Sequence, residues 1–311
     1  MWRLKILVQF ILARLPGGEQ VNYLFQQLRG SHSPSHVKER VLEIFSTLAA
    51  VGRVTNIEGS RVVEVGTGWD AIAPLALYLL GAKTTISYDH VAHLRLKRVR
   101  GTLDHMQACL GQLVSLTALS KSVLSERLAL ARSAPDLSSL LQRAGIIYKA
   151  PADATRTALT DASVDLIYSH AVMEHVPESA VRQLAEEARR ILKPGGMAVH
   201  YIGLGDHHHK CGVNFLQYSP RWWKFWAHNR IFYHNRLREK QFVEIHLSLG
   251  GSVQVISHTI RQDDLLALKT MDVARAFSGM THEELAVYRT LIAISFNGQA
   301  PELTDAIAWS E

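Results

Sequence analysis

The sequence predicts an α/β protein in which helices cover both faces of a sheet of seven mostly parallel strands. Three observations predict this fold. The apolar run at residues 62–65 ends in the glycine loop Gly66-Thr67-Gly68. Further apolar runs at residues 145–150 and 163–170 indicate buried strands. Apolar residues then recur at helical spacing between 181 and 192, so strands and helices alternate as they do in parallel sheets.

The remaining elements extend this pattern to both ends of the chain. We expect strands at 197–204, 253–260 and 290–296, with helices at 4–15, 21–28, 37–51, 263–277 and 283–287. The turn Lys193-Pro194-Gly195-Gly196 separates the helix before it from the strand after it. The predicted organisation is a helical cap at 1–58, a core at 59–210 with a helical insertion at 91–144, an aromatic and basic segment at 211–252, and C-terminal elements at 253–311 that complete the core. The insertion is expected to form a lid or a wall of the ligand site.

The glycine loop indicates a bound nucleotide-like ligand, because glycines let a ligand approach the backbone and the next helix presents its N-terminus. The run from Gly66 to Ala71 fits the G-x-G-x-x-G/A fingerprint of dinucleotide-binding enzymes. Asp89 follows where such enzymes place an acid for the ribose. The loop alone therefore leaves a nicotinamide cofactor open.

Two acidic residues favour a cationic ligand instead. Glu64 lies at the mouth of the first strand, where it would repel a pyrophosphate but suit an ammonium group. Asp70 adds a second negative charge where a diphosphate would lie. A third acid, Asp153, follows the strand at 145–150.

Taken in order, these motifs resemble the class I S-adenosylmethionine-dependent methyltransferases, which have a Rossmann-like fold, over about residues 59–205. The resemblance implies that S-adenosylmethionine is the cofactor. It implies these contacts: Glu64, Val65, Gly66, Thr67 and Gly68 at the methionine end, Asp89 and His90 at the ribose, Asp153 and Ala154 at the adenine, and Ser169 below the sulfonium. For Asp153, helix capping is a nearly equally good explanation. Asp70 departs from the family, which often has a third glycine there.

Composition agrees with a globular enzyme. The 311 residues can bury a large core, and two cysteines cannot build a disulfide framework, so we expect a cytoplasmic protein. The net charge of +6 favours acidic partners. The basic and apolar N-terminus is too short to span a bilayer. We expect a helix packed on the catalytic domain, with peripheral membrane contact as the alternative.

The segment after residue 205 supplies candidate acceptor contacts. Tyr218, Trp222 and Arg236 could stack on a sugar or another planar group, whereas a small aromatic core is the alternative explanation. The order of motifs in this segment resembles methyltransferases of bacterial polysaccharide and glycoconjugate gene clusters. We therefore expect a small-molecule or glycan acceptor. The strand at 163–170 lacks the Asn-Pro-Pro-Tyr type of motif that would indicate a nucleic-acid amino group.

Methylation of a hydroxyl requires a base, and histidine has a suitable pKa. The candidates are His207, with Asp206 as its orienting residue, and His170. Glu174-His175 is similar to the metal-binding pair of ubiquinone-pathway O-methyltransferases, but the additional acid of that motif is replaced by Ala171. We therefore predict no metal, while a divalent ion at this pair stays open. His207, His208 and His209 could add nitrogen ligands, although consecutive residues seldom converge on one ion without a turn. A nicotinamide oxidoreductase and a non-catalytic cofactor-binding scaffold remain the alternative functions.

Overall fold

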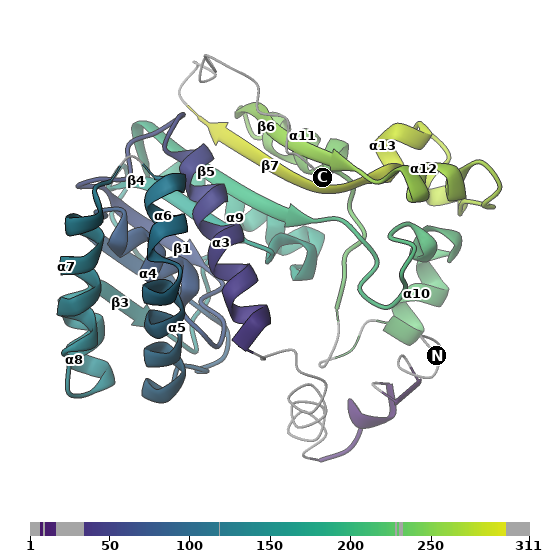
Figure 1. The fold of residues 1–311 in the computed structure, drawn as a ribbon. Coiled ribbons are helices and arrows are strands. Elements are labelled where there is room, and N and C mark those ends of the chain that lie inside the picture. Colours follow the sequence, from purple (N-terminus) through teal and green to yellow (C-terminus); the bar gives the residue numbers. More distant parts are fainter. Residues whose placement is uncertain are drawn as a thin grey trace.

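The computed structural model describes residues 7–8, 10–16, 34–117, 119–227, 229 and 233–296. Its centre is a seven-stranded sheet in the order β3-β2-β1-β4-β5-β7-β6 (Figure 1). The strands are β1 (Arg61–Val65), β2 (Thr84–Tyr88), β3 (Ile146–Lys149), β4 (Val164–His170), β5 (Leu192–Gly203), β6 (Ser252–Ile260) and β7 (Val287–Ser295). Only β7 among these strands runs antiparallel to its neighbours, β5 and β6. The predicted fold class is confirmed.

Two helical layers cover the sheet. On one face lie α3 (Pro34–Val51), α4 (Ile72–Leu79), α5 (Leu96–Ala108), α6 (Leu110–Leu116), α7 (Lys121–Arg132) and α8 (Leu137–Arg143). The other face carries α9 (Glu178–Ile191) and α11 (Glu239–Ser248). The alternation of β1 explains this arrangement, because Val62 packs into the first layer while Val63 and Val65 pack into the second. Glu64 therefore points to the same face as α4.

The insertion at 91–144 is helical, but its helices do not form a separate lid. Leu103, Met106, Leu113 and Leu124 are fully buried and belong to the same core cluster as the sheet. Each fully buried apolar side chain contributes about 1.5–3 kcal/mol through removal from water. This burial makes the insertion part of the layer that covers the sheet.

Several elements differ from expectation: β2 was not predicted, and β7, predicted at 290–296, spans Val287–Ser295. The strand predicted at 197–204 begins earlier, at Leu192, which pairs with Val164, and a register shift separates Val164 from Leu166. The turn Lys193–Gly196 is thus contained in β5 as an irregularity. The helix predicted at 263–277 is instead α12 (Gln262–Leu268) followed by the 3-10 turn η3 (Arg275–Phe277). The residues between them lie in neither element.

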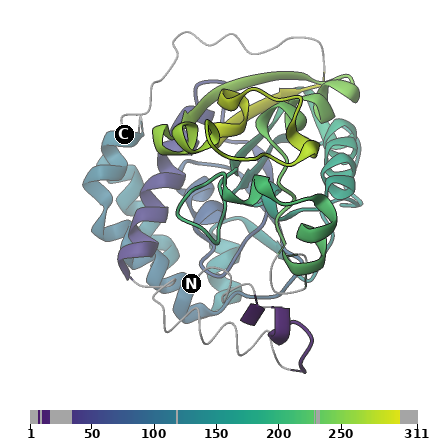
Figure 2. The same cartoon turned by 90° about the vertical axis from the view of Figure 1, so that its right-hand side faces the viewer.

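A third apolar cluster lies beyond the carboxyl ends of β4 and β5. It joins η2 (Asn214–Gln217) and α10 (Pro220–Ala227) to α12, η3 and α13 (His282–Ala286). Phe215 and Trp223 are its large buried members. Figure 2 looks onto this end of the molecule and shows the green segment after β5 below the yellow-green C-terminal elements.

At the N-terminal end, the helix predicted at 37–51 is present as α3, and residues 7–8 and 10–12 are helical. The ring of Phe10 lies 5.5 Å from that of Phe225 in α10. The helix predicted at 21–28 lies outside the described residues. Among the described helices, none is both long enough and apolar enough to cross a bilayer.

Candidate active site

The glycine loop between β1 and α4 is closely packed. Gly66 has a φ of 92° and Gly68 a φ of 65°, a backbone region that strains residues with a Cβ. A Cβ on Gly66 would also lie 2.2 Å from Cγ2 of Val172, in the segment that follows β4. Gly66 thus brings the loop directly against the segment that leads from β4 to Glu174.

Asp70 has a different role from the one expected. Arg98 of α5 donates hydrogen bonds to its Oδ1 from Nε (3.1 Å) and from Nη2 (2.7 Å), and Thr102 donates to its carbonyl oxygen (2.8 Å). The charge of Asp70 is therefore paired within the protein, and the residue fastens the loop to α5. In this loop the left-handed conformation falls on Ala71, with a φ of 49°, and not on Asp70. Position 70 therefore does not require the glycine that the family often has there.

Glu64 is a buried carboxyl group in the middle of the sheet. It lies opposite Ser87 of β2 and Tyr168 of β4. The Ser87 hydroxyl donates a 2.5 Å hydrogen bond to Oε2. Burial, with a smaller contribution from the charge of Asp89, raises the pKa of Glu64 to about 8. A cationic ligand group at this carboxyl would favour its ionised form.

Asp89 directly follows β2 and points at the glycine loop. Its Oδ2 accepts from the backbone N–H of Gly68 (2.8 Å), and its Oδ1 accepts from that of Val91 (3.1 Å). Burial opposes ionisation, but hydrogen bonds from His90, Gly68 and Val91 outweigh it and lower the pKa of Asp89. The His90 ring is highly exposed, with Nδ1 3.2 Å from Asp89 Oδ1. A charged acid therefore stands beside the loop.

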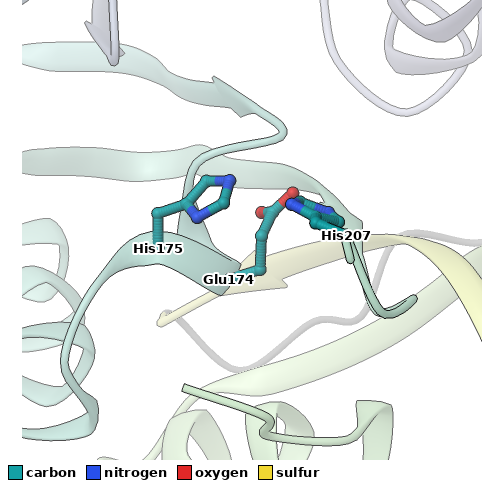
Figure 3. Close-up of side chains that lie close together, drawn as sticks. All are labelled: Glu174, His175 and His207. Atoms are coloured by element: carbon teal, nitrogen blue, oxygen red, sulfur yellow. The ribbon is translucent and has the colours of Figure 1, made fainter. Parts of the chain in front are cut away.

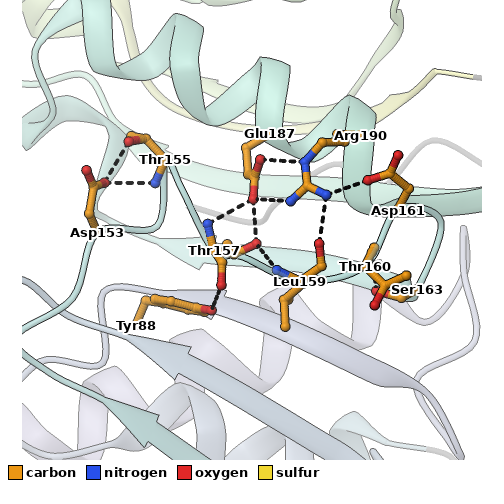
Figure 4. A network of polar contacts seen from close by, with 10 residues as sticks. All are labelled: Tyr88, Asp153, Thr155, Thr157, Leu159, Thr160, Asp161, Ser163, Glu187 and Arg190. Atoms are coloured by element: carbon orange, nitrogen blue, oxygen red, sulfur yellow. Dashed lines mark hydrogen bonds and ion pairs between the residues drawn. The ribbon is translucent and has the colours of Figure 1, made fainter.

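Asp153 lies on the loop after β3, which adjoins Asp89 because the backbone N–H of Ala152 donates to the Asp89 carbonyl (2.9 Å). Its Oδ1 accepts from both the backbone N–H and the hydroxyl of Thr155, at 2.9 and 2.7 Å (Figure 4). Further along, Glu187 of α9 accepts two bonds from Thr157. Asp153 thus caps its own turn and remains exposed at the edge of the sheet.

Two of the predicted residues on β4 are engaged inside the protein. The Ser169 hydroxyl lies 2.8 Å from Nδ1 of buried His200, so it does not line an open floor. His170 lies with Nδ1 3.1 Å from the Tyr168 hydroxyl and Nε2 3.6 Å from a carboxylate oxygen of Glu43. These contacts connect β4 to α3, and they leave His170 poorly placed to act as a base.

Three other polar side chains converge at the carboxyl ends of β4 and β5 (Figure 3). Glu174 and His175 belong to the 3-10 turn η1 (Met173–His175), and His207 lies on the loop after β5. One potential ligand atom from each lies within 4.8 Å of the others. Burial raises the pKa of Glu174 to about 8. The sequence offered His207 as a possible further ligand beside the Glu-His pair, and the structure brings one of the three consecutive histidines, His207, to that pair.

Asp206 does not orient His207. Its Oδ1 accepts from the backbone N–H groups of His208 (2.7 Å) and His209 (3.2 Å), and its Oδ2 accepts from the Asn214 amide (3.4 Å). Both oxygens thus hold the loop in shape. These contacts of the Asp206 carboxylate are thus with residues that follow His207.

The predicted acceptor contacts separate into two groups. Arg236 is buried, and its Nη1 donates to the carbonyl oxygens of Phe215 (2.9 Å) and Tyr218 (2.7 Å), so it supports the aromatic cluster. Trp223 is also buried, and its Nε1–H donates to the His234 carbonyl (3.1 Å). Tyr218 and Trp222 instead form a stacked pair with centroids 4.3 Å apart, and Trp222 is 38% exposed. The small-core explanation therefore suits Arg236 and Trp223, whereas Trp222 is the exposed member of a stacked pair whose other member, Tyr218, packs against the cluster.

The sheet distinguishes between the two cofactor classes. Dinucleotide-binding Rossmann enzymes have the parallel strand order 3-2-1-4-5-6. Here the antiparallel β7 lies between β5 and β6. The site also fits S-adenosylmethionine. Gly66 and Gly68 have no Cβ to obstruct a ligand, and they lie beside the buried carboxyl of Glu64 and the ionised Asp89. The nicotinamide alternative is not favoured.

Comparison with known proteins agrees with this fold. The profile of a methyltransferase domain family matches residues 111–200, which include β3 and β4. The strand order and this match, which spans less than a third of the chain, support a methyltransferase fold of class I with S-adenosylmethionine as its cofactor. The match does not include the glycine loop, whose assignment depends on its geometry. No curated protein sequence matches the chain.

Solved structures with similar folds include methyltransferases from distant organisms. A putative methyltransferase of Haloferax volcanii, in complex with the Trm112 activator, is 14% identical with a TM-score of 0.46, over 88% of this chain and 97% of that one. An S-adenosylmethionine-dependent methyltransferase of Mesorhizobium loti is 16% identical with a TM-score of 0.42, over 79% and 95% of the two chains. Likenesses at this level carry no argument about the acceptor or a partner.

Proposed function

We propose that the protein transfers the methyl group of S-adenosylmethionine to a hydroxyl group of a sugar, a glycan or another small metabolite. One observation carries this proposal. Glu174, His175 and His207 converge at the carboxyl ends of β4 and β5. Glu174 is two residues beyond Val172, which packs on Gly66. Groups that can accept or redistribute a proton thus adjoin the cofactor loop.

The cofactor contacts in this proposal follow the edge of the sheet. Glu64, Gly66 and Gly68 would hold the methionine end, together with Val65 and Thr67. Asp89 and His90 would bind the ribose, and Asp153 with the backbone of Ala154 would bind the adenine. Ser169 would contribute only its backbone, because its hydroxyl is engaged with His200.

When bound, the cofactor supplies an electrophilic methyl group. Transfer is an in-line displacement, so the protein's main tasks are to align the acceptor oxygen and to exclude water. A hydroxyl acceptor must also lose its proton. In a metal-free site we assign that task to His207, whose ring lies 5.0 Å from the His175 ring, without help from Asp206.

The acceptor class is supported by the stacked pair Tyr218 and Trp222. Exposed aromatic faces suit the apolar face of a sugar ring or another flat group. The net charge of +6 favours an acidic acceptor, such as a phosphorylated or carboxylated glycan. We do not propose nucleic acid, because β4 is followed by Ala171 and Val172 rather than by a motif for planar nitrogen.

We place the protein in the cytoplasm, with peripheral membrane contact through its N-terminal helix as a second proposal. Leu7, Ile11 and Leu15 expose apolar side chains near one end of the molecule, and Phe225 of α10 is exposed beside them. Such a surface suits an interfacial position. Cosedimentation with anionic vesicles, compared between the wild type and Ile11→Glu, tests it.

The test of the enzymatic function has two stages. Calorimetry with S-adenosylhomocysteine and, separately, with NADH establishes the cofactor class, and we expect heat only with the first. Cell extracts are then incubated with enzyme and S-adenosylmethionine and searched for products heavier by one methylene. Binding without any methylated product would support a non-catalytic scaffold and contradict this proposal.

A further inference from the structure

The cluster of Glu174, His175 and His207 has the composition of a metal site. It brings together two imidazole rings and one carboxylate from two loops, with one potential ligand atom from each within 4.8 Å of the others (Figure 3). Around a zinc ion with bonds of about 2.1 Å, tetrahedral ligand atoms lie about 3.4 Å apart. Small side-chain rotations would therefore close the cluster around an ion.

His175 is held in the tautomer that a metal requires. Its Nδ1 lies 2.8 Å from the backbone carbonyl oxygen of Tyr233. A carbonyl oxygen only accepts, so Nδ1 carries the proton and Nε2 keeps its lone pair. This arrangement, with the second ring nitrogen donating to a carbonyl, is typical of metal-binding histidines.

The environment of Glu174 is a second, independent indication of a bound cation. The residue is 1% exposed, and its Oε1 accepts from the backbone N–H of Gly203 (3.2 Å). Its Oε2 is buried and has no hydrogen-bond partner among the described residues. A buried polar atom without a partner is costly, and a cation would satisfy this one. A Cβ on Gly203 would lie 2.7 Å from Oε1, so this glycine provides the space for the carboxyl group.

The loop before α11 fixes the turn that carries both ligands. The side-chain amide of Asn235 donates to the carbonyl oxygens of Met173 (2.7 Å) and Val176 (2.8 Å), and its backbone N–H donates to that of Glu174 (2.9 Å). These bonds span η1 from end to end. The turn is thus rigidly positioned, as a metal site requires.

His234 borders the cluster but does not complete it. Its ring lies edge-on to that of His207, with centroids 5.1 Å apart. Its Nδ1 accepts from the backbone N–H of Arg236 (3.0 Å), which places the proton on Nε2. Such a nitrogen can donate to a ligand oxygen but cannot bind a cation.

We propose that Glu174, His175 Nε2 and His207 bind one divalent transition-metal ion. Two imidazoles favour Zn²⁺, Mn²⁺, Fe²⁺ or Co²⁺ over Mg²⁺ or Ca²⁺. Three protein ligands leave open positions, as in catalytic rather than structural sites. The ubiquinone-pathway motif has a further acidic ligand where this chain has Ala171. In the proposed site His207, from a different loop, supplies the third ligand instead.

An extension of this site rests on the proposed function. A hydroxyl oxygen of the acceptor would occupy an open position, where the ion lowers its pKa and its proton passes to water. The oxygen then forms a bond to the methyl carbon, and the carbon–sulfur bond breaks with its electron pair remaining on sulfur. His207 would in that case act as a ligand and not as the base.

The experiment measures metal binding in the absence of cofactor and acceptor. The full-length protein is stripped with a chelator and titrated with Co²⁺ alone, whose visible absorption reports coordination by nitrogen and oxygen. We expect one equivalent to bind. Glu174→Gln and His207→Ala should each weaken binding by more than about tenfold. His209→Ala is the matched control, because it removes a histidine from the same loop, and it should bind Co²⁺ like the wild type.

Two further measurements distinguish a loss of metal binding from a loss of folding or of cofactor binding. Glu174→Gln keeps an oxygen that can accept from Gly203, and each variant is checked by thermal unfolding and by affinity for S-adenosylhomocysteine. Absence of Co²⁺ binding to the wild type, or equal losses in His207→Ala and His209→Ala, would overturn the metal site. Intact methyl transfer by a protein that binds no metal would remove this inference alone. Metal binding without methyl transfer would contradict only the proposed function.

Discussion

Gly66 in the glycine loop packs so closely on Val172 that a Cβ would lie 2.2 Å from the valine Cγ2. This contact links the two halves of the candidate active site, because Val172 begins the segment that carries Glu174 and His175. The glycine loop and the segment that carries Glu174 and His175 are therefore in direct contact. A change at Gly66 should be felt on both sides.

We predict that Gly66→Ala lowers the affinity for S-adenosylhomocysteine by more than about tenfold, because it adds a steric clash to about 1–2 kcal/mol of backbone strain at positive φ. The double variant with Val172→Ala removes the 2.2 Å contact but leaves the Cβ of residue 172 at 3.3 Å and the backbone strain, so it should recover part of the affinity. Calorimetry on both variants checks this. Wild-type binding by Gly66→Ala would show that the loop does not hold the cofactor.

Burial of Glu64 makes the stability of the cofactor-free protein depend on pH. The pKa of Glu64 is raised from 4.5 to about 8, so the folded protein keeps a proton that the unfolded chain loses above about pH 4.5. Stability is therefore fully present below that pH and falls as the pH rises towards 8. Each pH unit within this window costs about 1.4 kcal/mol at most.

Glu64→Gln isolates this effect. Glutamine can still accept from Ser87 but cannot ionise, so the loss of stability between pH 5 and pH 8 should be smaller in the variant by a few kcal/mol, on the order of the cost above. Urea unfolding at both pH values measures it. Glu174, whose pKa is raised similarly, is common to both proteins and cancels in the comparison. Parallel pH profiles would mean that Glu64 is ionised in the folded protein.

The pairing of Asp70 with Arg98 should be structural. Arg98→Ala removes two hydrogen bonds from a buried carboxylate and leaves it the longer contact with Arg40, at 3.9 Å, so we expect a loss of about 1–3 kcal/mol of stability. The double variant with Asp70→Ala should be more stable than Arg98→Ala alone, because it also removes the uncompensated charge. A double-mutant cycle by urea unfolding provides the coupling energy. Additive losses would mean that the pair contributes no interaction energy.

The sequence predicted the sheet because its signals are local. Apolar runs identified six of the seven strands, all except β2 (Thr84–Tyr88), and the glycine loop indicated the edge where we expect the cofactor. The role of Asp70 could not be predicted, since Arg98 lies 28 residues away and is brought to it by the packing of α5. The same limit applies to His207, which meets Glu174 only because β4 and β5 are neighbours in the sheet. Local motifs indicate which residues are reactive or bind ligands, whereas the side chains that they contact from distant parts of the sequence are known only from the folded structure.

Substitutions of the adjacent residues Trp222 and Trp223 test whether the acceptor binds at the stacked pair of Tyr218 and Trp222. Trp222 is 38% exposed and stacks on Tyr218, whereas Trp223 is 2% exposed and donates to the His234 carbonyl. We expect Trp223→Ala to destabilise the protein by about 3–5 kcal/mol, because it opens a cavity in the aromatic cluster. Trp222→Ala should change stability by less than about 1 kcal/mol but raise KM for the acceptor severalfold, with kcat nearly unchanged. Thermal unfolding and steady-state kinetics with the acceptor identified from extracts separate the two effects. An unchanged KM in Trp222→Ala would place the acceptor elsewhere on the carboxyl edge of the sheet.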